Sequence, residues 1–369
     1  MFTIELLPAD EGDAIWVEYG FERTHRLLID CGRKTAYRKV AARLAQDPSI
    51  DFELFVLTHV DADHITGAVP LLQDTRFGPE RVRDVWFNGW RHLNGLHVDY
   101  EGDIPQTLSA SQGEFFAAVL RSQAYSWNGA FGGFAAVVEP RAALPEFTLP
   151  GGLRLTLLGP TPDKLEEMRG RWADDLQRSR HELEPGDYEH ALELLGDDRL
   201  HRPDVLGGPP SGPLRIDELA ELPFDPDTSE PNGSSISFLA ELGEKAVLFA
   251  ADAHAPQLAE VIRRLLDERG LSKLPLAALK MAHHGSARNN STELLELVDC
   301  QRFLISTNGS RHHHPDPAAL ARVIDVQQRD VTFYFNYRSD ETLLWDEPGL
   351  QRKYGFSVVY LTDDDRIEL

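Results

Sequence analysis

Residues 58–64 read Thr-His-Val-Asp-Ala-Asp-His, and this run constrains the fold more than any other part of the sequence. It follows Phe-Glu-Leu-Phe-Val-Leu, which is typical of a short buried strand, and it precedes a pattern typical of a helix. Side chains alternate along an extended chain, so His59 and Asp61 are expected to point the same way. Asp63 and His64 fall where the chain turns into the helix and face another direction. Imidazole and carboxylate groups suit divalent zinc, manganese or iron, so the run predicts ligands for two adjacent metal ions.

Three later segments each place a chemically suitable side chain after an expected strand. Asp252 ends an apolar stretch, where a carboxylate is costly unless it is paired or bound, so we expect it to bridge the two metals or to cap the next helix. His283 and His284 end another strand pattern, and Gly285 permits a sharp turn that would aim both at one cavity. We expect His283 to be a primary ligand. His314 follows a strand within a histidine-rich loop and is a candidate to reach the active site.

Composition divides the chain into parts. Residues 1–162 and 232–369 alternate strand and helix patterns, and the last expected strand covers 356–362. Residues 163–231 contain 19 acidic and 8 basic side chains, a balance of −11, with helical patterns at 164–183 and 188–195 and loops rich in Gly and Pro. We therefore expect one α/β domain interrupted by an acidic, mostly helical insertion. The insertion is either a cap or lid, or a solvated excursion without a role.

The net charge restricts the partners that the chain can bind. Lys and Arg number 37 and Asp and Glu 60, so the net charge is −23. Such a surface repels phosphate backbones and disfavours generic binding to nucleic acid, although a metal could supply local positive charge in a nuclease. Two cysteines are too few for a disulfide framework, and no apolar stretch is long enough for a membrane helix. We expect a cytoplasmic protein with no membrane association, and no feature indicates its oligomeric state.

Taken in order, these motifs resemble the metallo-β-lactamase superfamily, and more narrowly the hydrolase domain of ComEC-type DNA-uptake proteins and its stand-alone soluble relatives. The resemblance implies a four-layer αββα fold and a site for two divalent metal ions. Other matching segments are Gly12-Asp13-Ala14, Ile29-Asp30-Cys31-Gly32, Asn232-Gly233-Ser234-Ser235, His283-His284-Gly285-Ser286 and His314-Pro315. The expected metal ligands are His59, Asp61, Asp63, His64, Asp252 and His283. The expected catalytic groups are Asp61, His284 and His314, and the expected substrate contacts are Asn232, Ser235 and Ser286.

The sequence departs from the wider superfamily at one motif. A histidine expected between the first cluster and the bridging aspartate has no clear counterpart, because residues 159–162 read Gly-Pro-Thr-Pro. His284 or His92 could supply that ligand, and if His284 does not, it is expected to contact substrate.

The resemblance implies a binuclear hydrolase that uses a hydroxide shared by two metals, with zinc favoured and manganese or iron competitive. We expect a phosphodiesterase or nuclease acting on a phosphodiester or other small anionic substrate. The alternatives are a carboxylic ester or lactone hydrolase, and a scaffold in which the metals are purely structural.

Overall fold

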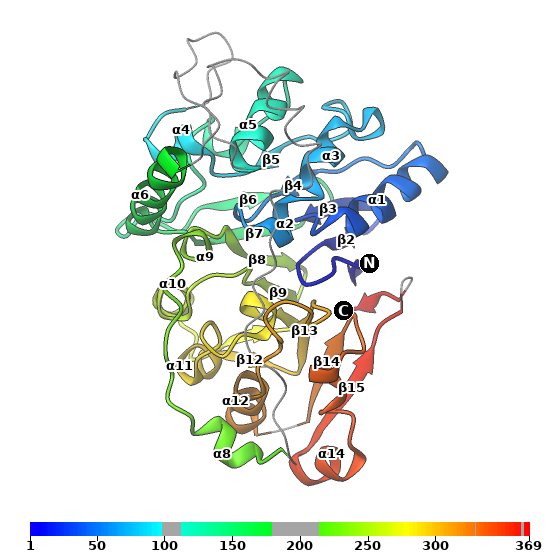
Figure 1. The fold of residues 1–369 in the computed structure, drawn as a ribbon, viewed down its shortest axis with the longest axis vertical. Helices are drawn as coiled ribbons and strands as arrows, with labels where there is room; N and C mark the ends of the chain where they lie inside the picture. Colours follow the sequence, from blue (N-terminus) through cyan, green and yellow to red (C-terminus); the bar gives the residue numbers. More distant parts are fainter. Residues whose placement is uncertain (98–111, 179–213, 329, 363–364) are drawn as a thin grey trace.

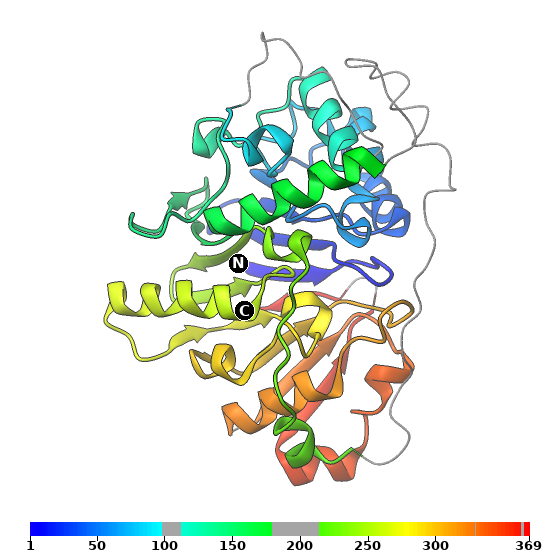
Figure 2. The ribbon, with the colours of Figure 1, turned by 60° about the vertical axis from the view of Figure 1, so that its left-hand side comes forward.

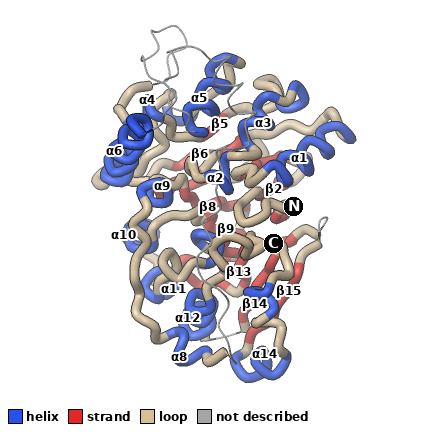
Figure 3. The backbone as a smooth tube through the Cα atoms, viewed as in Figure 1, coloured by secondary structure: helices blue, strands red, loops and turns tan. Residues whose placement is uncertain are grey.

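The computed structural model describes residues 1–97, 112–178, 214–328, 330–362 and 365–369. Two β-sheets face each other, and helices cover the outer face of each sheet (Figures 1 and 2). Figure 3 shows the strands gathered in the middle of the molecule, with helices around them. This arrangement confirms the expected α/β class and the order of its four layers.

The first sheet has six strands in the order β16-β1-β2-β3-β4-β5. Strands β16, β1, β2 and β3 pair antiparallel, whereas β3, β4 and β5 run parallel. Their bounds are Phe2–Leu6 (β1), Ile15–Tyr19 (β2), His25–Ile29 (β3), Leu54–Val56 (β4), Val85–Trp86 (β5) and Ile367–Glu368 (β16).

The second sheet has eight strands in the order β15-β14-β13-β11-β9-β8-β7-β6, and a separate parallel pair joins β10 to β12. Strands β9, β11, β13, β14 and β15 run parallel, so their carboxyl ends lie along one edge. The bounds are Glu146–Thr148 (β6), Arg154–Gly159 (β7), Ser237–Leu242 (β8), Lys245–Phe249 (β9), Leu274–Leu276 (β10), Ala278–Lys280 (β11), Val298–Cys300 (β12), Arg302–Ile305 (β13), Val331–Phe335 (β14) and Phe356–Tyr360 (β15).

Helices α1, α3 and α5 cover the first sheet, and α10, α11 and α12 cover the second (Figure 1). The helix bounds are Lys34–Gln46 (α1), Ala62–Ile65 (α2), Ala68–Gln73 (α3), Trp90–Leu93 (α4), Gln112–Ser122 (α5), Pro162–Arg178 (α6), Ile216–Ala220 (α8), Glu230–Gly233 (α9), Ala255–Arg269 (α10), Thr292–Glu296 (α11), Pro317–Gln327 (α12), Asp340–Leu343 (α13) and Pro348–Tyr354 (α14).

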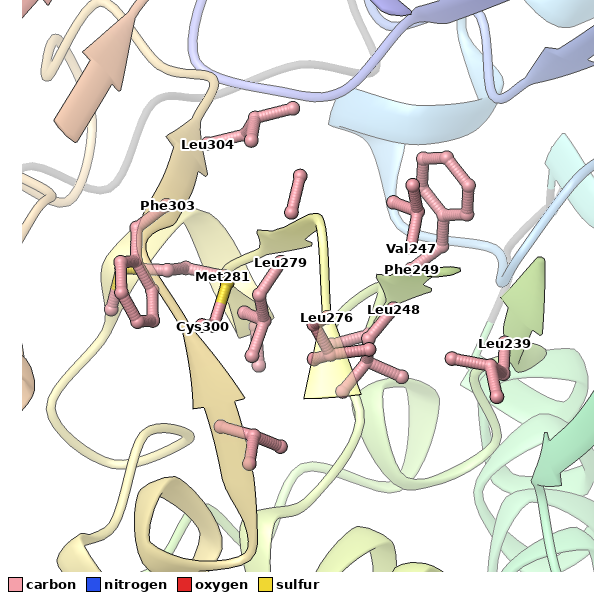
Figure 4. Close-up of a cluster of buried hydrophobic side chains, with 14 of the residues drawn as sticks. Leu239, Val247, Leu248, Phe249, Leu276, Leu279, Met281, Cys300, Phe303 and Leu304 are labelled. Carbon is pink, nitrogen blue, oxygen red and sulfur yellow. The ribbon is translucent and has the colours of Figure 1, made fainter. Parts of the chain in front are cut away.

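Alternation along the strands produces two hydrophobic cores. In β2 and β3, Val17 and Leu27 belong to the core that includes the second sheet, whereas Trp16 and Leu28 pack with the helices of the first sheet. Figure 4 shows the part of the larger core around β9, β11 and β13, where apolar side chains of the strands, including Leu248, pack against one another. The two hydrophobic cores fix the positions of the strand ends. A site built from several ligands requires such fixed positions.

The expected insertion is only partly described. Its first helix pattern is confirmed as α6, and α6 buries Leu165, Met168 and Trp172 in the core of the first sheet. The second helix pattern, at 188–195, lies outside the described residues. Treating residues 163–231 as a separate cap or lid therefore stays a prediction. No helix in the described ranges is long and apolar enough to cross a bilayer.

Candidate metal centre

The ends of three strands build a buried cluster of histidines and carboxylates where the two sheets meet. β4 leads into the loop with His59 and then into α2, β9 leads to Asp252, and β11 leads to the turn with His283 and His284. The backbone N–H of Ile236 donates to the carbonyl of Thr58 at 2.9 Å and so ties the loop after β4 to the second sheet.

The carboxylate of Asp252 is the hub of this cluster. Its Oδ2 atom lies 3.8 Å from Nε2 of His59, 3.4 Å from Nε2 of His64, 3.8 Å from Nε2 of His283 and 3.6 Å from Nε2 of His284. Asp63 adds a second carboxylate, whose Oδ2 is 3.2 Å from Nε2 of His284. The fold thus brings together the strand ends at which the sequence predicts metal ligands.

The outer nitrogen of three of these imidazoles is held by an acceptor. His64 Nδ1 lies 2.8 Å from Oδ2 of Asp30, and His284 Nδ1 lies 2.9 Å from the carbonyl of Ser306. His59 Nδ1 lies 3.0 Å from the hydroxyl of Thr58, which itself donates to Asp30 at 2.8 Å. Nδ1 is therefore a protonated nitrogen in each ring, and Nε2 is the nitrogen whose lone pair can bind a metal.

Those lone pairs are left without partners among the described residues. Nε2 of His59, His64 and His284 and Oδ1 of Asp252 are buried and accept no hydrogen bond. Burying such atoms unpaired is costly unless a ligand satisfies them. Two ligands of one tetrahedral zinc ion lie about 3.3–3.5 Å apart, close to the separations around Asp252. The donor set therefore fits divalent metal ions.

Four overlapping sets of ligand atoms among the described residues meet this condition, and two of them leave out Asp13. The first comprises Asp63, His64 and His284, and the second comprises His59, His64 and Asp252; within each set the atoms lie within 4.8 Å of one another. His64 belongs to both of these sets, and because its Nδ1 is bonded to Asp30, its Nε2 can bind only one ion.

Electrostatics couple the carboxylates to the imidazoles. Burial alone would raise the pKa of Asp252, but the charges of His64 and His284 lower it well below its usual value. Burial alone would lower the pKa of His284, but Asp252 and Asp13 raise it to about 10. Without metal, His284 is therefore protonated on both ring nitrogens at neutral pH, so metal binding there has to displace a proton.

An unusual turn directs both adjacent histidines toward Asp252. His283 and His284 have φ values of 47° and 54°, and Gly285 follows with φ of 88°. Left-handed backbone is strained for residues with a side chain and persists only where the surroundings enforce it. The sequence predicts that Gly285 alone makes this turn, whereas in the structure three consecutive residues have positive φ.

The other expected site residues lie at different depths. Asp61 has a side chain 40% exposed, with Oδ2 3.6 Å from Nε2 of His59, so it lies on the open side of the cluster. His283 is 22% exposed and lies outside both tight ligand sets. The ring of His314 is 5.1 Å from that of His283, and its Nδ1 lies 3.5 Å from Oδ1 of Asp316, which is not one of the cluster carboxylates.

The three expected substrate contacts are buried. Asn232 is 3% exposed and donates to Asp227 at 2.6 Å, and Ser235 and Ser286 are 0% and 2% exposed. All three side chains are therefore shielded from solvent. His92 does not join the cluster, because backbone groups of Gly89 and Gly133 contact its two ring nitrogens.

Sequence reasoning did not assign roles to several residues that surround the cluster. Asp13 and Asp30 lie in segments that were recognised only as motifs, and here their carboxylates contact imidazoles of the cluster. Asp227 and Asn289 lie next to His283, and neither belongs to a motif recognised in the sequence. For those two, the pattern of residue types in the sequence offers no signal.

Comparison with known proteins places these features in a family. Residues 8–309 match the Metallo-beta-lactamase superfamily. The search of curated proteins found no match. The chain is also similar in structure to CmlA, a diiron beta-hydroxylase from Streptomyces venezuelae, with 12% identity and a TM-score of 0.40 over 100% of this chain and 53% of that chain. A mutant of CmlA beta-hydroxylase gives 11% identity and a TM-score of 0.40, with 100% and 54% covered. The chain spans about half the length of these proteins.

Proposed function

The chain belongs to the metallo-β-lactamase superfamily, and on this basis we propose that it is a metal-dependent phosphodiesterase with two divalent ions in the cluster around Asp252. The observation that carries the proposal is the set of buried Nε2 atoms that point at Asp252 and have no partner among the described residues. Zinc is the favoured metal, and manganese or iron would also suit the mixed nitrogen and oxygen donors.

The residues divide between two ions around a shared carboxylate. His59, Asp61 and His283 would hold one ion, and Asp63, His64 and His284 would hold the other, with Asp252 contacting both. His284 thereby supplies a ligand on the Asp63 side. Ions held there would acidify a bound water and would neutralise negative charge developing on the reacting phosphate.

Side chains of the protein would transfer the protons and hold the metal ligands in position. Asp61, the most exposed of the cluster carboxylates, would accept a proton from the attacking water if it is not fully bound to metal. His314, whose ring is next to that of His283, would donate a proton to the leaving alkoxide. Asp30 holds His64 directly and His59 through Thr58, and so fixes the orientation of both rings in the cluster.

The substrate class is supported by the motifs that resemble ComEC-type hydrolases and by the charge of the chain. A net charge of −23 repels long polyanions, so a small phosphodiester is favoured over duplex DNA.

Hydrolysis assays of the metal-loaded chain test the proposal. The chain should cleave bis(p-nitrophenyl) phosphate when loaded with zinc, manganese or iron, and chelation should abolish the activity. Assays with p-nitrophenyl acetate and a lactone run in parallel. Preference for the ester or lactone would replace the proposal with a carboxylic ester hydrolase, and two bound metals without any turnover would favour a scaffold.

A further inference from the structure

His283 differs from the other cluster histidines in what faces its outer nitrogen. Nδ1 of His283 lies 3.0 Å from Oδ1 of Asn289 and 3.3 Å from Nδ2 of Asn232. The first contact needs a proton on Nδ1, whereas the second needs a lone pair there. The two contacts therefore demand opposite tautomers, and the neighbours of the two amides decide between them.

The carboxylate of Asp227 determines how both amides are oriented. Its Oδ2 atom accepts from Nδ2 of Asn232 at 2.6 Å and from Nδ2 of Asn289 at 3.0 Å, and its Oδ1 atom accepts from the backbone N–H of Ser229 at 3.0 Å. An ionised carboxylate only accepts, so both amides must turn their NH₂ groups toward it. The Asn289 NH₂ also donates to the carbonyl of Asp252 at 3.1 Å, which favours the same orientation.

The orientation of Asn289 then fixes His283. With its NH₂ committed to Asp227, Asn289 presents Oδ1 to His283 and accepts a proton from Nδ1. The Asn232 NH₂ donates one proton to Asp227 at 2.6 Å, and its 3.3 Å contact with Nδ1 is longer than the 3.0 Å contact from Nδ1 to Asn289, so the Asn289 contact decides where the proton lies. His283 is left with a bare Nε2, 3.8 Å from Oδ2 of Asp252.

We propose that Asp227 and Asn289 form a positioning pair that sets the tautomer of His283 and so makes its Nε2 available to a metal. The proposal rests on the ligand role of His283 in the proposed function. It also gives the acidic segment 163–231 a defined role at the metal centre, because Asp227 belongs to that segment and its carboxylate is 8% exposed.

The tautomer can be measured on metal-free protein by two-bond ¹H–¹⁵N correlation spectra after labelling of the histidines, with His283→Gln to assign the signal. Wild-type His283 should carry its proton on Nδ1. Asn289→Ala removes the acceptor and leaves Asn232 as the nearest amide, so the proton should move to Nε2. The exchange Asp227→Asn/Asn289→Asp restores an acceptor beside Nδ1 and should return the proton to it.

Metal affinity provides the second readout, by competition with a chelator. Loss of a group that orients a ligand costs about 10- to 100-fold in affinity, so Asp227→Ala and Asn289→Ala should each weaken binding of one ion by about tenfold or more. If the two act as one pair, the double variant should be no worse than Asn289→Ala alone. The matched control is Asp225→Ala, two residues away with a side chain 84% exposed, which should leave affinity unchanged.

An unchanged tautomer and affinity in Asn289→Ala would overturn the proposal, as would additive losses in the double variant. Failure of the proposed function looks different. A wild-type chain that binds two metals but cleaves no phosphodiester would refute the activity and leave these measurements valid. The tautomer measurement needs no metal, so it decides the proposal even if the wild-type chain binds none.

Discussion

The ammonium group of Lys280 lies 2.6 Å from Oδ2 of Asp13, and both side chains are fully buried. The other oxygen of Asp13 lies 3.4 Å from Nδ1 of His284, so the ion pair supports a residue of the metal centre from behind. Burial alone would raise the pKa of Asp13, but Lys280 and His284 lower it to about 2. The carboxylate is therefore charged at neutral pH and depends on Lys280 for compensation.

Lys280→Met should destabilise the metal-free protein by about 3–5 kcal/mol, because it leaves a buried carboxylate without its partner. Urea unfolding measures the loss. Lys273→Met, at an exposed position seven residues earlier, is the control and should change stability little. Adding Asp13→Asn to the Lys280 variant removes the stranded charge and should recover part of the loss. Equal stability of the Lys280 and Lys273 variants would show that the pair contributes nothing.

Asp252→Asn should weaken both metal ions together, because Oδ2 of Asp252 lies 3.8 Å from Nε2 of His59 and 3.6 Å from Nε2 of His284, which would hold different ions. Competition titration with a chelator measures the two affinities, and Asp267→Asn, on the exposed face of α10, is the control. Loss of only one ion would mean that Asp252 is a terminal ligand.

The parts of the site that could be predicted from sequence are those encoded locally. The run 58–64 follows a buried strand, and both periodicity and ligand density are visible within a dozen residues. The same holds for Asp252 and for the pair His283 and His284, each at the end of an apolar strand. Strand ends on parallel strands converge, so their meeting in one place follows from the expected fold.

What could not be predicted depends on contacts between segments distant in sequence. Asp30 holds His64 across 34 residues, and Asn289 is oriented by Asp227 across 62 residues. No local pattern encodes such partners. The expected last strand at 356–362 is also not the last, because the two-residue β16 follows and pairs with β1. Two residues are too few for a periodicity to be recognised.

Gly12 is required by the close approach of the N-terminal turn to the metal-binding loop. A Cβ atom on Gly12 would lie 1.7 Å from the carbonyl oxygen of Asp63, so Gly12→Ala must displace that backbone. We expect weaker binding of the ion that Asp63 would hold, by about tenfold, the lower end of the range for lost ligand positioning. Metal titration tests this.

Gly170→Ala in α6 is the matched control, because a Cβ there meets nothing within 4 Å. It should keep metal affinity and raise stability by about 0.5–1 kcal/mol through helix propensity. Wild-type metal affinity in Gly12→Ala would contradict the packing argument.

Glu114 should make the stability of the protein depend on pH. This residue of α5 is buried, and its carboxylate accepts a hydrogen bond from Nε1 of Trp172 in α6 at 3.0 Å. Burial raises its pKa from 4.5 to about 7, although the bond from Trp172 acts in the opposite direction. Because the pKa is higher in the folded than in the unfolded chain, its contribution to stability is fully present below pH 4.5 and is lost as pH rises through about 7.

Glu114→Gln keeps an acceptor for Trp172 and removes the titration, so it isolates this effect. A rise of 2.5 pKa units, from 4.5 to about 7, corresponds to about 3 kcal/mol. The variant should therefore match the wild type near pH 4.5 and exceed it by about 3 kcal/mol at pH 8. Urea unfolding at both pH values measures the difference, with Glu166→Gln on the exposed face of α6 as the control. The prediction fails if the stability difference between Glu114→Gln and wild type does not grow between the two pH values. The Glu114 carboxyl would then ionise in the folded chain as readily as in the unfolded one. In that case the buried contact between α5 and α6 would have to admit water.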